Sequence, residues 1–343
     1  MAYPVKSSRL QSVTAPSERF PQAGVDYPAT WQAFETWFSD DDSCRAYLAR
    51  LRWPEGFRCP MCGGDQAWQT TRGMWMCRSC GRQTSVTAGT IFHRTHYPLR
   101  TWFAAAWLVC SQKTGASALG LQRVLGFGSY ETAWTWMHKL RRAMVRPERD
   151  QLGGPGVTVE LDQTFVGGRS RGGRCARYET KAEVTIAVER RHPKGFGRIR
   201  MRRISTNRKD DIFDFVADCI APGTVLYTDG DLLYTELPDD LGITHERIVV
   251  ATAADPAHVL LPAVHRVASL LKRWLAGTLH FGQSRAQLDY YLDEFTFRFN
   301  RRTSRSRGLL FYRLLQQAVN TDPHPLHTLV AAPDGYPEWA SEG

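Results

Sequence analysis

The sequence predicts a multidomain α+β protein: a small cysteine-rich β-module, a helical segment, and an α/β domain with a mixed sheet. Three observations support this fold class. The chain has 343 residues, more than one ordinary hydrophobic core organises. Four of its cysteines form two close pairs among glycines and β-forming residues. After residue 156 the apolar residues change from helical spacing to alternation, which is typical of strands.

The composition favours a folded protein with a polyanionic partner. Hydrophobic residues make up 43% and charged residues 23% of the chain, which excludes a wholly disordered protein. The chain has 44 Lys and Arg against 34 Asp and Glu, a net charge of +10. A basic excess of this size is typical of nucleic-acid-binding proteins. The longest strongly apolar run, Trp102–Cys110, is too short to cross a bilayer, so we expect no membrane partner.

The changes of composition along the chain predict six segments. The first is Ser/Pro-rich and without periodicity, which indicates a mobile arm. A Gly/Pro-rich linker over 151–156 marks the start of the α/β domain. The expected segments are a mobile N-terminal arm (1–27), a short helical segment (28–54), the cysteine-rich module (55–97), a three-helix DNA-binding or connector segment (98–150), the α/β domain (151–315) and a C-terminal tail (316–343).

Helical spacing predicts the elements before the linker. The stretch from Thr30 to Leu51 indicates two short helices, separated at Ser39–Asp42, where Asp and Ser are good caps. Three further helices are expected after Leu99, separated by glycines at 115 and at 126–128.

Beyond the linker the pattern predicts three strands, a helix, two more strands around a short helix, and a strong helix. The strands are expected near 157–165, 181–191, 196–206, 223–230 and 245–251, the order of an α/β fold. Pro262 suits the first turn of the strong helix, and Gly277 suits its end. A last helix is expected at about Arg285 to Asn300.

The two cysteine pairs predict a structural zinc site. Each CxxC turn places two sulfurs on one side, and two such turns supply the tetrahedral shell that zinc prefers. The alternatives are two redox-active pairs or a chance arrangement. Glycines follow each pair, where the backbone needs a positive φ, and a hairpin is expected between the pairs. The ligands are Cys59, Cys62, Cys77 and Cys80.

Two basic stretches are candidate DNA contacts. The third helix of the 98–150 segment carries Lys139, Arg141 and Arg142, and the segment is similar in size to a helix-turn-helix. Between Gln163 and Arg208 there are thirteen Lys and Arg against three acids. Such residues pair bidentately with phosphates, but they also form the solvated faces of ordinary helices and strands. The strand candidates are Arg198, Arg200, Arg202 and Arg203.

Two aspartates are placed at expected strands of one sheet. Asp162 lies in VELDQTF and Asp229 ends VLYTDG. Either alone is most simply a turn former. Held close together, two carboxylates raise each other's pKa unless a cation bridges them. Oxygen ligands on rigid strands suit Mg²⁺ or Mn²⁺, so the pair is a candidate catalytic metal site.

The expected third ligand is unusual, because no Asp or Glu lies between Pro256 and Leu288. The strong helix instead places His265 and Lys272 on its polar face, seven residues apart. They are a candidate pair of metal ligand and phosphate-binding cation. The alternative is that His265 is a histidine at the surface or at the edge of the core.

At these residues the sequence resembles the ISXO-like insertion-sequence transposases. The resemblance extends over nearly the whole chain, from about Tyr27 to Tyr312. It is carried by the order and spacing of several motifs, which are YPATWQAFETWF, LRWPEGFRCPMCGG, the second CxxC, ETAWTWMHKLRRAM, VELDQTFVGG, YTDG, LPAVHRVASLLKRWLAGT and FRFNRR.

The resemblance implies a zinc ribbon and a DDE-type catalytic domain with the RNase H-like fold. Asp162 and Asp229 then correspond to the two metal-binding aspartates. His265 takes the third position, which varies among Glu, Asn and His in this family, and Lys272 follows seven residues later. The chain departs from the pattern at Gln163, where Glu is common, and in DLLY after TDG.

The implied activity is metal-dependent cleavage and strand transfer of DNA at terminal inverted repeats, with two Mg²⁺ or Mn²⁺ ions. Double-stranded DNA is the implied partner, with Arg301 and Arg302 on the flanking or target backbone, and no small-molecule substrate. A homodimer or higher assembly in the prokaryotic cytoplasm, at the nucleoid, is expected. Three alternatives stay open: a domesticated DNA-binding regulator, a structure-selective nuclease, and a zinc-ribbon transcription factor.

Overall fold

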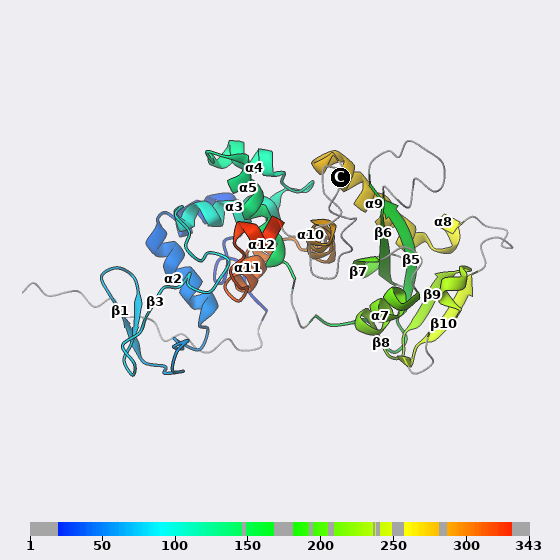
Figure 1. Cartoon of the computed structure of the whole chain (residues 1–343), viewed down its shortest axis with the longest axis horizontal. Helices are drawn as coiled ribbons and strands as arrows, with labels where there is room; N and C mark the ends of the chain where they lie inside the picture. The colour runs from blue at the N-terminus through cyan, green and yellow to red at the C-terminus, as the bar shows by residue number, and fades with distance from the viewer. Residues whose placement is uncertain are drawn as a thin grey trace, which may run out of the picture. The chain divides into compact units, whose positions relative to one another are not determined.

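The computed structural model describes residues 20–145, 149–167, 181–191, 195–204, 209–235, 237, 241–248, 257–280 and 287–330. The chain folds as two compact units, and Figure 1 labels most of their elements. The first unit holds the chain up to Ala104 together with Ser306–Pro323. The second unit holds Ala105–Arg305 together with the residues from His324.

Capped helices open the first unit. They are α1 (Trp31–Trp37) and α2 (Asp41–Arg52). The Asp40 side chain accepts a hydrogen bond from the backbone N–H of Ser43 at 2.8 Å, and the Ser43 hydroxyl completes a capping box. The break between two short helices, expected at Ser39–Asp42, is therefore confirmed.

Aromatic side chains form much of the first unit's core. Helix α11 (Arg307–Ala318) belongs to this unit and contributes Phe311. The ring of Phe311 meets those of Phe34 and Phe103 edge to face, with centroids 5.6 and 5.8 Å apart. Edge-to-face packing of this kind stabilises a core beyond the area that it buries.

The cysteine-rich module is a three-stranded antiparallel sheet in the order β1-β2-β3. Its strands are β1 (Ala67–Gln69), β2 (Trp75–Cys77) and β3 (Gln83–Thr84), so the expected hairpin between the cysteine pairs is confirmed. Only Phe57, Cys59 and Cys77 are buried in its core cluster. A core of this size is too small to hold a fold without a further cross-link.

Three helices precede the large sheet, as the glycine spacing predicts. They are α3 (Leu99–Ser111), α4 (Ala118–Leu125) and α5 (Tyr130–Arg142). Gly126 ends α4 in the left-handed conformation, with φ of 69°. The division between the two units falls inside α3, so α4 and α5 lie in the same unit as the sheet.

The second unit is built on a five-stranded mixed sheet in the order β10-β9-β5-β6-β7. Strands β5, β6 and β7 are antiparallel neighbours, whereas β9 runs parallel to β5 and to β10. This is the mixed sheet expected of an RNase H-like domain. The strands are β5 (Thr158–Val166), β6 (Ala182–Arg190), β7 (Phe196–Ile204), β9 (Val225–Asp229) and β10 (Thr244–Ile248). A separate pair joins β4 (Leu152–Gly153) to β8 (Ile220–Ala221).

Helices cover both faces of this sheet (Figure 1). On one face α9 (Pro262–Leu279) packs on apolar residues of β6 and β7, such as Ile186 and Met201. On the other face α7 (Lys209–Cys219) packs on β5 residues such as Leu161. Because side chains alternate along β5, Asp162 lies on the face that α9 covers.

Helix α10 (Leu288–Asn300) lies along β7, the edge strand of the sheet. The Asn300 side chain accepts a hydrogen bond from Ile199 N at 2.7 Å and donates one to Ile199 O at 3.1 Å. Asp289 accepts a further bond from Arg203 N. These contacts satisfy backbone groups that an uncovered edge strand would leave open to another chain.

Two expectations about the helices are wrong. The strong helix does not stop at Gly277 but continues to Leu279, and His280 ends it in the left-handed conformation. The helix expected to be the last is followed by α11 and by α12 (Leu326–Val330). A short α8 (Ala257–Leu260) and a 3₁₀ turn η1 (Leu232–Tyr234) complete the described elements. No helix in the described residues combines the length and apolar character needed to span a membrane.

Candidate catalytic and metal-binding sites

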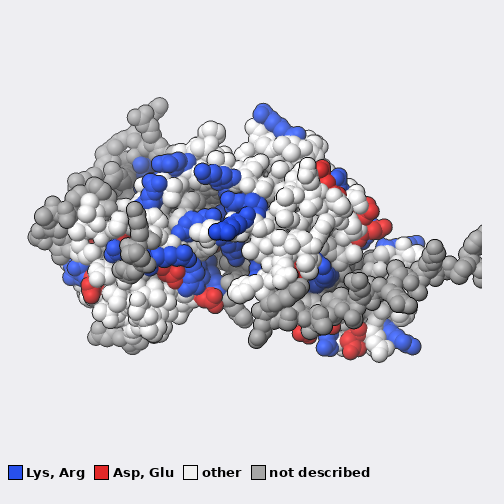
Figure 2. Space-filling model, turned by 180° about the vertical axis from the view of Figure 1, so that it is seen from behind, with Lys and Arg blue, Asp and Glu red and all other residues white. Residues whose placement is uncertain are grey.

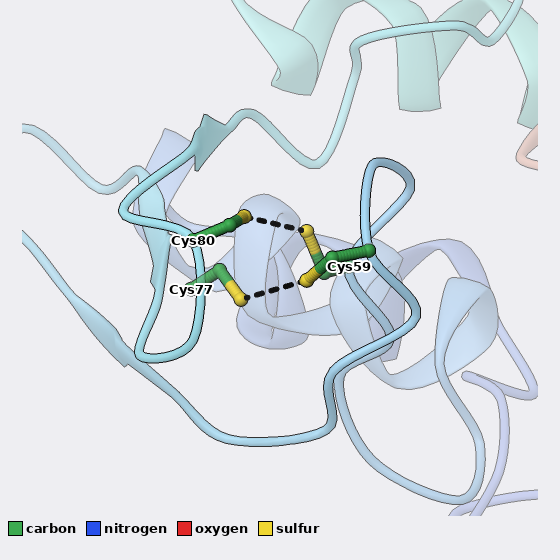
Figure 3. Close-up of side chains that lie close together, drawn as sticks. Cys59, Cys77 and Cys80 are labelled. Atoms are coloured by element: carbon green, nitrogen blue, oxygen red, sulfur yellow. Dashed lines mark hydrogen bonds between the residues drawn. The ribbon is translucent and has the colours of Figure 1, made fainter.

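The four cysteines of the first unit converge on one point. Their sulfur atoms all lie within 4.8 Å of one another. The sulfurs of Cys59 and Cys80, and those of Cys62 and Cys77, are each 3.6 Å apart. Figure 3 shows Cys59, Cys77 and Cys80 directed toward one another. Zn–S bonds of about 2.3 Å in a tetrahedron place neighbouring sulfurs about 3.8 Å apart, so the tetrad has the size of a zinc shell.

Two equivalent turns build this tetrad. Gly63 N donates to Cys59 O at 2.9 Å, and Gly81 N donates to Cys77 O at 3.0 Å. Both glycines have positive φ, 71° and 69°, as predicted from their positions after the cysteine pairs. The N–H of Cys62 points at the Cys59 thiol and lowers its pKa to about 6, which favours the thiolate that binds metal. The residues fit a structural zinc ion.

The two aspartates occupy adjacent strands in the second unit. The parallel pairing of β5 with β9 places Leu161 beside Thr228, and the next residue on each strand is Asp162 and Asp229. Neighbouring strands lie about 4.8 Å apart, so the two carboxylates project from adjacent positions. Sequence reasoning placed them on neighbouring strands, and the register brings them level.

Burial raises the pKa of both carboxyl groups. The pKa of Asp162 is raised to about 7, first by burial and then by the charge of Asp229. The N–H of Gln163 and the charge of Lys272 oppose this shift. The pKa of Asp229 is also raised by burial and by the charge of Asp231, and is lowered by His265 and Arg247. A divalent cation would offset the free-energy cost of burying these carboxylates and of placing negative charges close together. The carboxylate pair therefore fits a hard metal ion.

The α9 residues lie beside this pair. His265 Nε2 is 3.9 Å from a carboxylate oxygen of Asp162. Lys272 is exposed two turns further along the helix, close enough for its charge to act on Asp162. In the described residues the cysteine tetrad is the only group of three or more potential ligands whose atoms all lie within 4.8 Å. Asp162, Asp229 and His265 are therefore neighbours without forming so tight a cluster.

Glu160 is a residue of this site that sequence reasoning missed. It is fully buried two residues before Asp162, on the same face of β5. Its carboxylate accepts hydrogen bonds from Ala263 N at 2.8 Å and Val264 N at 2.9 Å, and lies 3.3 Å from Arg190. Helix α9 has no side-chain cap of its own. Glu160 therefore caps α9 from the strand that carries Asp162.

Two further polar residues adjoin the carboxylates. Asp231 donates its backbone N–H to Asp229 at 3.1 Å, and its carboxylate caps η1 through Leu233 N. The hydroxyl of Tyr234 is buried without a hydrogen bond of normal geometry among the described residues. Burial and the nearby carboxylates raise its pKa, whereas the approach of Gln163 lowers it. The positions that depart from the family pattern, Gln163 and DLLY, thus adjoin each other beside the site.

Of the three basic residues predicted on α5, one is buried and two are partly buried. Arg141 is buried and makes an ion pair of 2.8 Å with Glu294, which is also buried, on α10. Arg142 lies over the ring of Tyr290 at 3.7 Å, and Lys139 is partly buried. Burial removes Arg141 from the surface on which we expected DNA, and its position gives it the role of joining α5 to α10.

Three of the four arginines predicted on β7 are paired with carboxylates. Arg198 binds Glu189 at 2.6 Å, Arg202 binds Asp218 at 2.7 Å, and Arg203 lies 3.3 Å from Asp289. Arg200 is buried. After α10, Arg301 stacks on Phe297, and Arg302 stacks on Phe299 and donates to Gly197 O. These side chains support the sheet edge, a role that their regular spacing in the sequence did not indicate.

Comparisons with known proteins agree with this architecture. Residues 151–300 match the family described as "ISXO2-like transposase domain", and residues 39–83 match "Transposase zinc-ribbon domain". A relative from Halobacterium salinarum, "Uncharacterized protein in transposable element ISH50", is 28% identical over 273 residues, which cover 73% of this chain and 88% of the relative. The zinc-ribbon cysteines and the mixed sheet lie within the matched regions, and the domain over residues 151–300 belongs to the ISXO2-like transposase domain family.

Proposed function

We propose that this protein is a catalytically active DDE-type DNA transposase. It cleaves DNA at the terminal inverted repeats of its insertion sequence and joins the freed ends to target DNA. The observation that carries this proposal is the meeting of Asp162, Asp229 and His265, which come from three separate elements of one unit. Family membership and the relative from a transposable element agree with it.

Asp162, Asp229 and His265 would hold Mg²⁺ or Mn²⁺. When bound, such ions activate the attacking hydroxyl and stabilise the leaving oxygen of a phosphodiester. The chain's own residues then position the DNA. Lys272 would hold a phosphate near the scissile bond, because its ammonium group is exposed on the same helix as His265. Glu160 would keep that helix in register with Asp162.

The zinc ribbon and the helices of 98–150 would bind the inverted repeats. The predicted flanking contacts of Arg301 and Arg302 remain part of this proposal, since both side chains are only partly buried. Joining two ends needs two catalytic sites, so a dimer or a higher assembly is the expected working form.

The test is a strand-transfer assay with purified protein. The protein is incubated with the DNA that flanks its own gene and with a target plasmid, in Mg²⁺ or Mn²⁺, and new junctions are sequenced. Wild type should produce junctions at defined ends with short target duplications. Asp229→Asn should produce none, because the substitution removes a charged ligand.

A matched control separates this effect from general damage. Asp214 is an exposed carboxylate on α7, and Asp214→Asn makes the same chemical change away from the pair. It should form junctions as wild type does. Sequence-specific binding without cutting, alike in wild type and Asp229→Asn, would contradict the proposal and favour a domesticated regulator.

A further inference from the structure

A basic pocket lies at the edge of the second unit's sheet, apart from the aspartate pair. It has a volume of about 250 Å³ and is formed by β7, the C-terminal half of α10 and the segment before β4. Figure 2 shows lysine and arginine side chains gathered in one dense group on the face turned away in Figure 1. The charged residues that line the pocket are Arg149, Arg198, Arg200, Arg301, Asp150 and Asp293.

Arg200 is the central feature of this pocket. It is only 6% exposed, and among the described residues no carboxylate lies within ion-pairing distance of it. Its guanidinium donates to the backbone carbonyls of Ile199 at 3.0 Å and Asp150 at 2.6 Å. Burial, then the charges of Arg149 and Arg198, lower its pKa to about 10, whereas Cys219 and Glu189 act in the opposite direction. Arg200 is therefore charged at neutral pH without a counter-ion, a costly arrangement that a bound anion would relieve.

The carboxylates of the pocket do not supply that counter-ion. Asp150 has a side chain that is 83% exposed and contributes its backbone carbonyl to Arg200. Asp293 lies 3.9 Å from Arg149, and burial raises its pKa to about 7, so it carries only part of a negative charge at neutral pH. Arg198 is neutralised by Glu189. The pocket thus keeps a net positive charge around Arg200.

The pocket and the aspartate pair lie on different parts of the sheet. Arg200 pairs in register with Ala187, whose side chain packs in the cluster beneath α7. Asp162 lies on the opposite face, under α9, and two strands away from β7. A phosphate in the pocket therefore belongs to a different part of the DNA from the phosphodiester that Asp162 would face.

We propose that this pocket binds one backbone phosphate of a DNA segment that runs past the β7 edge, outside the segment being cleaved. The proposal rests on the proposed function, and it adds a second anchoring point for the flanking or target DNA. The planar, multiply donating guanidinium of Arg200 suits a phosphate, and Arg149 borders the same space.

The test measures how duplex binding depends on salt. Arg200→Gln is made in the Asp229→Asn background, and affinity for a short duplex is measured over a range of KCl concentrations without divalent metal. Log affinity falls as log salt concentration rises, and loss of one phosphate contact should make this fall less steep, by about 1 in the magnitude of the slope. Affinity at low salt should fall about tenfold or more, as expected for a charge-assisted contact.

Two variants accompany this measurement. Arg305→Gln removes the same charge from an exposed arginine that does not line the pocket, and it should leave the slope unchanged. If circular dichroism shows that Arg200→Gln does not fold, Arg149→Gln replaces it, because this side chain lines the pocket and is 31% exposed. It should lower the slope in the same way.

A second arm uses inorganic phosphate to identify the source of the anion. Melting of wild type and Arg200→Gln is compared in phosphate and in chloride of equal ionic strength. Stabilisation of wild type by phosphate with no change in the DNA slope would overturn the DNA assignment. A slope for Arg200→Gln equal to that of wild type would also overturn the proposal. So would a loss of affinity and slope in Arg305→Gln as large as the loss in Arg200→Gln. Because no cleavage is measured, failure of the proposed catalysis would leave these readings unaffected.

Discussion

At the scale of single residues, the charge state of Asp162 dominates the candidate site. Its side chain is 16% exposed and lies level with a second, partly buried carboxylate, that of Asp229. Burial and the Asp229 charge raise its pKa to about 7. Without a cation, about half of this carboxyl group is therefore protonated at neutral pH in the folded protein, whereas an unfolded chain would ionise it near its ordinary pKa.

This difference predicts how Asp162→Asn changes stability with pH. Because the pKa is raised in the folded state, the contribution of protonated Asp162 to the free energy of unfolding is fully present below about pH 4. This contribution is lost as pH rises through about 7. Zinc-loaded protein without added Mg²⁺ or Mn²⁺ should gain about 2 kcal/mol more from Asp162→Asn at pH 8 than at pH 5. Urea unfolding at both values measures this. Asp150→Asn, an exposed control, should show no such difference, and an equal effect of Asp162→Asn at both pH values would contradict the raised pKa.

His265 predicts a metal preference. A neutral imidazole is a softer ligand than a carboxylate and brings no negative charge, so we expect Mn²⁺ to support cleavage better than Mg²⁺. His265→Glu should raise the ratio of Mg²⁺-supported to Mn²⁺-supported cleavage, and His265→Ala should abolish both. Initial cleavage rates in each metal measure the ratio. Equal activity of His265→Ala and wild type would remove this residue from the mechanism.

At the scale of elements, the relation between α9 and β5 determines whether the site exists. His265 and Asp162 lie 3.9 Å apart, and the N-terminus of α9, which positions His265, is hydrogen-bonded to Glu160 on the strand of Asp162. Pro262 starts the helix but cannot cap it, and Leu261 offers no side-chain acceptor. A buried carboxylate from the strand supplies the missing acceptor and also interacts favourably with the helix dipole.

Glu160→Ala should therefore reduce both stability and catalysis. The loss leaves two buried N–H groups without an acceptor and should lower the free energy of unfolding by about 2–4 kcal/mol. Glu160→Gln keeps one acceptor and should cost less. Urea unfolding is the measurement, and Glu246→Ala, an exposed glutamate on β10, should change stability by less than about 0.5 kcal/mol. A wild-type stability for Glu160→Ala would show that α9 is held by its apolar face alone.

At the scale of the whole molecule, the second unit and the zinc ribbon of the first unit are stabilised in different ways. The second unit has apolar cores on both faces of its sheet. The zinc ribbon in the first unit has only three buried residues in its core cluster and four cysteines around one point. Structural zinc supplies folding free energy directly in modules of this size.

Removal of zinc should therefore act locally. Cys80→Ser should lower the zinc content to zero, and hydrogen exchange of β1, β2 and β3 should become fast, while β5 and β6 keep their protection. Elemental analysis and hydrogen–deuterium exchange measure the two effects. Cys44→Ala, which changes a buried cysteine outside the tetrad, should keep one zinc ion. Retained zinc in Cys80→Ser would contradict the four-cysteine shell.

Local sequence signals predicted much of this architecture. The CxxC turns, the capping residues near Asp40 and the alternation along β5 and β6 depend on neighbours in the chain, so their order and type could be recognised. The stop at Gly277 was wrong because Leu279, in the last turn of α9, still packs against the core, and Gly is tolerated where packing holds a helix. The helices after Asn300 were missed, since α11 takes its position from contacts with the distant N-terminal residues.

The sequence by itself predicted the cysteine tetrad, the main strands along the chain, and Asp162, Asp229 and His265 as candidate catalytic residues, because spacing and residue type carry that information. Only the tertiary structure decided which charged side chains are available to DNA. Arg141 and Glu294 are 153 residues apart in the chain yet share one buried ion pair. Nothing local distinguishes Arg200, which is buried and has no carboxylate partner in the described part of the chain, from its paired neighbours on β7. Burial and pairing are properties of contacts between distant segments, and they arise only when the chain has folded.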